Sequence, residues 1–356
     1  MQMSLVGSIA KWYWSFYIHR KPAPLITHLV LTNICNYRCT FCYLNADEAK
    51  YTMPLDQFKP LVSDLHALGA YYLYISGGEP LLVKNIEEYI VWAKKHIPYV
   101  HIVTNGSLLD ENMAKLLNRC EVNEVSLSLD ALEKTHNLHR GNDKAFSKLL
   151  QAIENLKAHA PRIATTCTTI LGPWNMDEQE ELHRLCASLG VRQRYQGFQE
   201  YPAVLERQNG TTLLTKEFLD QLQAFLATLP ARDRDRYMSL QVQYYAHRLG
   251  LGELKHPIFS DPCLLPYYYV NILGSGEVCP CYGVKSDMYP GTGCIDPPKK
   301  FSLHERSILE IFNDPAYARM AHDLKPCTEC KNYFASCYIR PRLVFPAEKY
   351  LRYHLS

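Results

Sequence analysis

Most of the first 200 residues follow one repeating hydrophobic pattern. From about residue 25, short apolar runs of strand length alternate with longer segments that carry apolar residues at helical spacing. The short runs predict strands at 26–32, 71–75, 99–103, 123–129, 162–170 and 191–197. The longer segments predict helices at 55–68, 84–96, 110–118, 144–158 and 177–189. Strands that alternate with helices predict a parallel sheet covered by helices, and therefore an α/β fold.

Residues 1–24 carry a different pattern, an apolar and aromatic stripe at helical spacing. The stripe consists of Leu5, Val6, Ile9, Trp12, Tyr13, Phe16 and Tyr17, and the other side carries Ser4, Ser8, Lys11 and Ser15. One interpretation is a helix that lies on a membrane surface through residues 5–18. The other is a helix that docks on the barrel or covers its open side. The second is favoured because the polar side carries few positive charges.

Beyond residue 200 the pattern changes again. Residues 201–260 predict a helical linker, with helices at 215–229 and 234–249. Residues 261–356 contain seven of the 13 cysteines of the chain, more than a packed core collects by chance. We therefore expect four parts: an N-terminal amphipathic helix (1–24), an α/β core (25–200), the linker, and a small cysteine-rich C-terminal domain.

Composition narrows the class of protein. A chain of 356 residues is too long for one average domain. Its formal net charge of +2 gives no electrostatic footprint for nucleic acid. No apolar run is long enough to cross a bilayer. Because the chain has many cysteines and no cleavable signal, we expect metal binding in a reducing, cytoplasmic compartment and no disulfide framework.

Three cysteines directly after the first predicted strand are the strongest chemical feature. Cys35, Cys39 and Cys42 follow the spacing C-x3-C-x2-C, and thiolates are the normal ligands of iron–sulfur clusters. Three thiolates on a four-iron cluster would leave one iron open for a small molecule. A zinc site and chance clustering are the alternatives, although a structural zinc ion usually takes four ligands and no fourth is nearby.

These cysteines, with Phe41 just before the last of them, resemble the signature of the radical S-adenosylmethionine (radical SAM) superfamily. The resemblance continues in order through Gly77-Gly78-Glu79-Pro80, Thr104-Asn105-Gly106, Ser126-Leu-Ser-Leu-Asp130 and His139-Arg140-Gly141. It implies a partial (β/α)6 barrel resembling a TIM barrel, with the site in loops that follow the carboxyl ends of the strands. It also implies a 4Fe–4S cluster that binds S-adenosylmethionine (SAM).

The resemblance assigns roles to individual residues. Cys35, Cys39 and Cys42 would ligate the cluster, and Phe41 and Pro80 belong to the cofactor-binding motifs. Gly77 and Gly78 would let the backbone approach the methionine amino group, with Glu79 as its carboxylate partner. Asn105, Ser126 and Ser128 would bind the ribose or the carboxylate of SAM, although half-buried strand alternation explains the serines nearly as well. Arg140 would make a bidentate contact with the SAM carboxylate.

The C-terminal cysteines resemble a second family, the auxiliary-cluster domain called SPASM or its shortened twitch form. The resemblance implies that Cys263, Cys281, Cys327 and Cys330 ligate one auxiliary 4Fe–4S cluster, with Cys279 and Cys337 as alternates. Gly276 lies five positions before Cys281, which favours Cys281 over Cys279. A full SPASM domain needs further cysteines, and Pro341 stands where another is expected. Zinc remains the alternative for this domain.

Together the resemblances imply an enzyme that reductively cleaves SAM. The resulting 5′-deoxyadenosyl radical would abstract a hydrogen atom from the substrate, with electrons supplied by a flavodoxin- or ferredoxin-type donor. The expected function is a peptide or protein maturase. The alternatives are a dehydrogenase or epimerase of a small metabolite or lipid, and a metal protein that only carries electrons.

Overall fold

A computed structural model describes residues 5–19, 21–42, 44, 49–200, 209, 211–230, 236–253, 265–280 and 301–323. Its centre is a sheet of parallel strands: β1 (Ile26–Thr32), β2 (Tyr72–Gly77), β3 (Tyr99–Thr104), β4 (Glu124–Ser128), β5 (Ala164–Leu171) and β6 (Arg192–Gly197). Each strand pairs in parallel with the next one along the chain. The predicted partial barrel is confirmed, and each strand lies within two residues of its predicted start and end.

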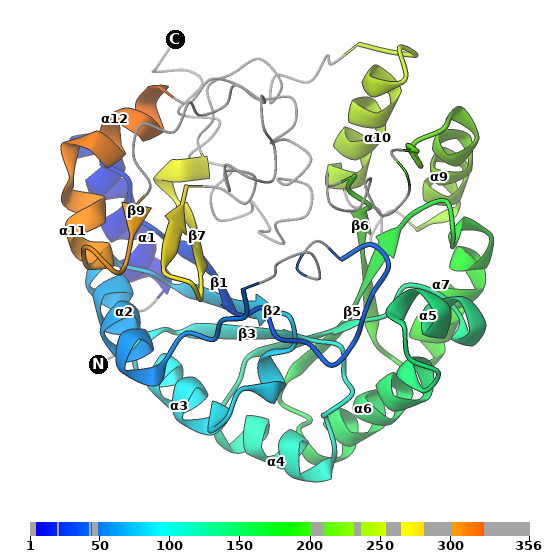
Figure 1. Ribbon diagram of the computed structural model, residues 1–356, viewed down its shortest axis with the longest axis horizontal. Helices are drawn as coiled ribbons and strands as arrows, with labels where there is room; N and C mark the ends of the chain where they lie inside the picture. The colour runs from blue at the N-terminus through cyan, green and yellow to red at the C-terminus, as the bar shows by residue number, and fades with distance from the viewer. Residues whose placement is uncertain are drawn as a thin grey trace.

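Helices cover the outside of these strands (Figure 1). They are α2 (Leu55–Leu68), α3 (Ile86–His96), α4 (Glu111–Arg119), α6 (Ala145–His159) and α7 (Gln179–Ser188). The apolar stripe of α2 shows how the sequence produces this layer, because Phe58, Leu61, Val62 and Leu65 recur at helical spacing and are all buried. Gly69 ends α2 with a φ of 98°, a left-handed conformation that glycine adopts without steric cost.

A short helix that the apolar pattern did not predict, α5 (Glu133–Arg140), follows β4. Its sequence is almost entirely polar, and its buried residues are His136 and Arg140. Helical periodicity finds apolar stripes, so this helix gave no signal. Its carboxyl end lies against the cysteine loop and helps to build the site described below.

The C-terminal part of the chain extends the same sheet. Strand β7 (Tyr269–Leu273) pairs in parallel with β1, and β8 (Glu277–Cys279) and β9 (Phe301–Ser302) follow in antiparallel order. The sheet order is β6-β5-β4-β3-β2-β1-β7-β8-β9. Helices α11 (Ile308–Asn313) and α12 (Pro315–Asp323) follow β9. Cys279 is buried in β8, whereas Cys263, Cys281, Cys327, Cys330 and Cys337 lie outside the described residues.

The linker contains the two expected helices, α9 (Lys216–Thr228) and α10 (Arg236–Arg248). They pack on β6 through a second apolar cluster that includes Tyr195, Phe218, Leu222 and Tyr245. The end of β6 is therefore supported from outside the barrel. The four-part division of the chain stays a prediction.

The N-terminal segment forms α1 (Leu5–Tyr13) and a π-helical turn (Trp14–Ile18). Trp12 is buried and donates a hydrogen bond from Nε1 to the Tyr267 carbonyl oxygen at 2.7 Å. The predicted polar side was wrong in part, because Ser8 is fully buried and Lys11 bonds the Ala67 carbonyl oxygen at the end of α2. This helix docks on the barrel by a face that mixes polar and aromatic residues. Membrane contact through residues 5–18 stays a hypothesis.

Candidate active site at the carboxyl ends of the strands

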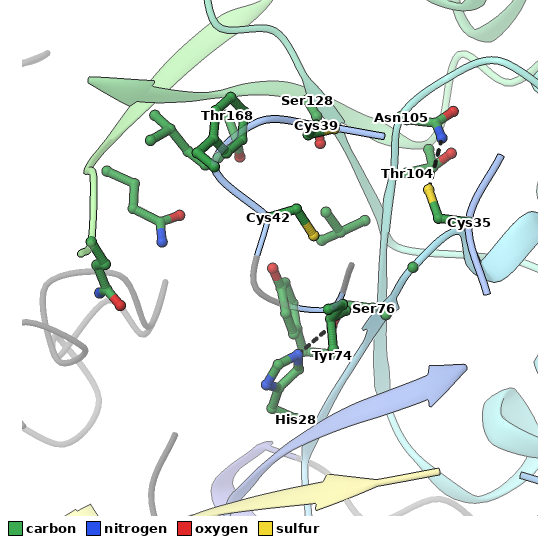
Figure 2. Close-up of a pocket in the computed structure, with 18 of the residues that line it drawn as sticks. His28, Cys35, Cys39, Cys42, Tyr74, Ser76, Thr104, Asn105, Ser128 and Thr168 are labelled. Atoms are coloured by element: carbon green, nitrogen blue, oxygen red, sulfur yellow. Dashed lines mark hydrogen bonds between the residues drawn. The ribbon is translucent and has the colours of Figure 1, made fainter. Parts of the chain in front are cut away.

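A cavity opens at the carboxyl ends of the barrel strands, and the cysteine loop forms one of its walls (Figure 2). Nine residues predicted from the sequence line it: Cys35, Cys39, Phe41, Cys42, Gly77, Gly78, Asn105, Ser128 and Arg140. Glu79, Pro80 and Ser126 are not among its lining residues. The barrel thus brings together most of the predicted site from the ends of four strands, β1 to β4.

The His139-Arg140-Gly141 motif holds the cysteine loop in place. The backbone N–H of Thr40 donates to the His139 carbonyl oxygen at 3.0 Å, and that of Arg38 donates to the Arg140 carbonyl oxygen at 3.4 Å. Gly141 has a φ of 64°, and a Cβ there would lie 2.9 Å from the Arg38 carbonyl oxygen. Only glycine fits this close approach without a shift. The carboxyl end of α5 therefore fixes the loop between Cys35 and Cys42.

Arg140 links the cysteine loop to the end of β4 through a buried ion pair with Asp130. Its Nε and Nη2 lie 2.7 and 2.6 Å from Oδ2 of Asp130, and its Nη1 lies 3.8 Å from Cys39 Sγ. The other oxygen of Asp130 accepts the Ile170 backbone N–H at 3.0 Å. The guanidinium edge expected to bind the SAM carboxylate is thus engaged by Asp130. Contact of Arg140 with SAM stays a prediction.

The three thiols fit an iron–sulfur cluster better than a single metal ion. Among the residues that the structure describes, no three His, Cys, Asp or Glu side chains lie close enough to hold one ion. A zinc ion needs its ligands within about 2.0–2.3 Å of one point, whereas each thiolate of a cluster binds its own iron. Cys35, Cys39 and Cys42 all line the same cavity. The zinc alternative for these cysteines is therefore disfavoured.

Hydrogen-bond donors surround the sulfur of Cys35. The backbone N–H of Tyr37 lies 3.3 Å from Cys35 Sγ, and Asn105 Nδ2 lies 3.9 Å from it (Figure 2). Burial raises the pKa of the Cys35 and Cys39 thiols, so these groups stay protonated until a metal displaces the proton. Donors directed at a sulfur stabilise its thiolate form. The loop is therefore arranged to favour bound thiolate.

Gly77 and Gly78 make a close backbone contact that the sequence did not reveal. A Cβ on Gly77 would lie 2.1 Å from the Thr32 carbonyl oxygen, and one on Gly78 would lie 2.2 Å from the Ile34 carbonyl oxygen. The Gly78 N–H donates to Thr32 at 2.7 Å. Both glycines line the cavity, but the contact that requires glycine is with the start of the cysteine loop. They fix where that loop leaves β1.

Glu79 is buried beside the cavity and is not among its lining residues, so its expected contact with SAM stays a prediction. Its carboxylate accepts hydrogen bonds from the Leu81 N–H, the Thr104 hydroxyl and the Asn105 N–H at 2.7–3.0 Å. Pro80 begins the short 3-10 turn that Glu79 caps. Burial raises the pKa of Glu79 to about 7, and these hydrogen bonds oppose the shift. In this structure Glu79 joins the β2 and β3 loops through these hydrogen bonds.

The two serines of β4 occupy different layers of the barrel. Ser128 lines the cavity, whereas Ser126 is buried one layer below. Ser126 Oγ lies 2.8 Å from His101 Nε2 and 2.6 Å from Thr166 Oγ1. Burial lowers the pKa of His101 to about 4, so this imidazole is neutral at pH 7. Ser126 therefore belongs to the polar floor of the barrel.

Phe41 forms an aromatic stack with a residue that sequence reasoning missed. Its ring lies parallel to that of Trp174, with centroids 5.5 Å apart and an interplanar angle of 6°. The Arg140 guanidinium also lies over the Phe41 ring, 5.3 Å from the ring centroid. A Cβ on Gly172 would lie 2.3 Å from the Trp174 ring, so the glycine makes room for it. Trp174 follows β5, and no motif marked it.

Family models match both parts of the chain in which cysteine motifs were found. The radical SAM superfamily model matches residues 29–186, and the model of an iron–sulfur cluster-binding domain, SPASM, matches residues 263–332. The antilisterial bacteriocin subtilosin biosynthesis protein AlbA of Bacillus subtilis is 31% identical over 90% of this chain and 68% of its own length. The chain belongs to the radical SAM superfamily.

Two further proteins define how far the likeness extends. Fe-coproporphyrin III synthase of Methanosarcina barkeri is 29% identical, over 44% of this radical SAM chain and 41% of its own length. The match thus spans about two fifths of that relative. SuiB of Streptococcus suis, solved with its precursor peptide SuiA bound, has a TM-score of 0.62 at 14% identity. That alignment covers 90% of this chain and 74% of SuiB, and it shows the shared fold.

Membership makes this chain an enzyme that uses SAM, a 4Fe–4S cluster and auxiliary iron–sulfur chemistry in its SPASM part. When bound, the first cluster supplies the electron that cleaves SAM. Cys35, Cys39 and Cys42 are the residues that would hold it, and the Asp130–Arg140 pair would keep Cys39 in position. In the described part of the chain, no helix is long and apolar enough to span a membrane.

Proposed function

We propose that this radical SAM enzyme is a maturase that abstracts a hydrogen atom from a residue of a ribosomally made peptide. One observation carries the proposal: a relative named for bacteriocin biosynthesis aligns with nine-tenths of the chain, through both the barrel and the C-terminal domain. The fold is also shared with a protein solved with a precursor peptide bound. The peptide would enter the cavity opposite the cysteine loop.

The charge of the cavity supports a peptide over a phosphorylated metabolite. The described lining residues include no lysine, aspartate or glutamate. Their one arginine is Arg140, whose charge is neutralised by Asp130. His28 also lines the cavity, but burial lowers its pKa to about 3 and it is neutral. A triphosphate or a polycarboxylate usually needs charge-assisted partners. The remaining lining is aromatic, hydroxyl and amide, which suits an uncharged amino-acid residue.

The dehydrogenase or epimerase of a small molecule stays the second candidate. It is favoured by the partial likeness to Fe-coproporphyrin III synthase, which covers less than half of this chain. A porphyrin carries carboxylates, for which the described cavity offers no free cationic side chain.

The test is anaerobic turnover of the full-length, cluster-reconstituted enzyme with SAM and a strong reductant. Short open reading frames beside the gene supply candidate precursor peptides, and pooled metabolites supply the alternative. We expect 5′-deoxyadenosine release to rise with one peptide, together with a change in the mass of that peptide. Release of 5′-deoxyadenosine that responds to a metabolite and to no peptide would overturn the maturase proposal.

A further inference from the structure

We propose that Gln199 and Thr168 form a receptor for a peptide group of the substrate, an inference that rests on the maturase function. Both residues line the cavity. Gln199 is 7% exposed and Thr168 is 9% exposed. Neither the amide oxygen and nitrogen of Gln199 nor the hydroxyl of Thr168 has a hydrogen-bond partner among the described residues. Two residues that line one cavity thus carry three buried polar atoms with no partner among the described residues.

A buried side-chain amide without hydrogen-bond partners is unfavourable unless a ligand supplies those partners. Leaving a buried donor or acceptor unsatisfied costs about 1–3 kcal/mol, so such groups are rare outside functional sites. Gln193, six residues earlier and within β6, shows the ordinary arrangement. Its Nε2 donates to Thr169 at 2.7 Å, and its Oε1 accepts the Tyr195 hydroxyl at 3.0 Å. Several buried side chains among the described residues have one atom without a partner, but Gln199 is the one with two such atoms.

The backbone directly before Gln199 is fixed, which holds this residue at the cavity wall. The Phe198 N–H donates to the Leu171 carbonyl oxygen at 2.9 Å, and the Phe198 carbonyl accepts the Tyr245 hydroxyl at 2.5 Å. A Cβ on Gly197 would lie 2.6 Å from that same hydroxyl, so α10 packs directly against the end of β6. A binding group held in this way is preorganised for its ligand.

The chemistry of the two side chains identifies the ligand class. A primary amide presents one acceptor and two donors in one plane, and a threonine hydroxyl can donate or accept. An extended peptide residue directs its own N–H and C=O to the same side, as in a strand pair. The Gln199 amide can bond both at once, and the Thr168 hydroxyl can bond a neighbouring group. The receptor would therefore bind the backbone N–H and C=O groups of an extended substrate segment.

The first measurement compares the melting temperature of the full-length, reconstituted enzyme with that of two matched variants. We expect Gln199→Met to raise it by about 1–2 °C, because the substitution removes two unsatisfied atoms. Gln193→Met removes two made hydrogen bonds and should lower it by about 2–4 °C. A lower melting temperature for Gln199→Met would show that its amide has a partner within the protein, which would overturn the inference.

The second measurement adds a defined probe, N-acetyl-trialanine methylamide at about 10 mM, a concentration that suits a weak ligand. Its counterpart carries an ester oxygen in place of the central N–H. We expect the peptide to raise the melting temperature of the wild type more than the ester does, and to leave that of Gln199→Met unchanged. Equal shifts with both probes, or a shift that survives in Gln199→Met, would contradict a backbone receptor.

The two proposals can fail separately. If a precursor peptide is modified at the same rate by the wild type and by Gln199→Met, the maturase function stands and the receptor is wrong. If no peptide supports turnover but the probe binds through Gln199, the receptor stands and the substrate is a different amide.

Discussion

The two walls of the cavity differ in the contacts made by their main polar side chains, although the Tyr37 hydroxyl on the cysteine loop also has no hydrogen-bond partner among the described residues. On the wall that carries the cysteine loop, Arg140 bonds Asp130 and Cys39, and donors surround Cys35. On the wall formed by the ends of β5 and β6, the side chains of Thr168 and Gln199 have no partner among the described residues. Cys35 and Thr168 lie on opposite sides of the cavity in Figure 2.

This difference shows which polar groups already have their hydrogen-bond partners before a substrate arrives. Groups that hold a cofactor work best when their geometry is fixed in advance, because any reorganisation costs free energy at the moment of reaction. Groups that recognise a substrate must instead keep some hydrogen-bonding capacity for it. Arg140 and Cys35 on the cysteine wall show the first arrangement, and Thr168 and Gln199 on the β5–β6 wall show the second. Variants that act on one wall alone can test the comparison.

The largest effect is expected from Cys39→Ala on the cysteine wall. Because this change removes one of three proposed thiolate ligands, reconstituted protein should lose about four irons per chain and all release of 5′-deoxyadenosine. Iron and sulfide content and the visible absorption of the cluster provide the measurement. Cys120→Ala is the matched control, since Cys120 is also buried but ends α4 and does not line the cavity. Equal iron content in the two variants would contradict the assignment of Cys39.

A large loss of stability is expected from Asp130→Ala. Removing one partner of a buried ion pair leaves the other charge uncompensated, so the free energy of unfolding should fall by about 3–5 kcal/mol. Asp130 also accepts the Ile170 N–H, so the change loosens both β5 and the cysteine loop. Chemical denaturation of the full-length protein measures the loss.

The control for this ion pair is Glu87→Ala. Glu87 pairs with Arg119 at 3.4 Å, and both side chains are at least half exposed. Exposed pairs contribute about 0–1 kcal/mol, so this variant should unfold almost as the wild type does. The double variant Asp130→Ala/Arg140→Met should regain part of the stability lost in Asp130→Ala. A double variant that is less stable than the single one would show that burial of the charge is not the cause.

The parts of this site that the sequence could predict are those marked by a local motif or by a regular apolar period. The cysteine triplet and the Gly77-Gly78 pair are local patterns, and the barrel brings them together as expected. The strands and most helices were also predictable, since their apolar residues recur with a regular period. Helix α5 was missed because its buried residues are His136 and Arg140. Local motifs and periodicity were therefore sufficient for the frame of the site.

Contacts between distant segments could not be predicted in the same way. The sequence placed Glu79 and Arg140 toward SAM, yet their partners in the structure are Thr104, Asn105 and Asp130. Those partners depend on how the loops of neighbouring strands meet, which spacing does not encode. Gln199 carried no signal at all, because an unsatisfied amide is defined by what surrounds it. Such residues become visible only when the packing is known.

The smallest expected effect is the difference between two adjacent threonines of β5. Thr169 Oγ1 donates to the Leu129 carbonyl oxygen at 2.6 Å and accepts from Gln193 Nε2 at 2.7 Å, whereas Thr168 Oγ1 has no partner among the described residues. Thr169→Val should lower the free energy of unfolding by about 1–3 kcal/mol, because it leaves buried groups unsatisfied. Thr168→Val should leave it unchanged or raise it by up to about 1 kcal/mol, because it removes an unsatisfied hydroxyl of similar shape. Denaturant midpoints of the two variants, measured without substrate, make the comparison. Similar losses in both would mean that the hydroxyl of Thr168 is bonded in the free enzyme, and the contrast between the two walls would then fail at this residue.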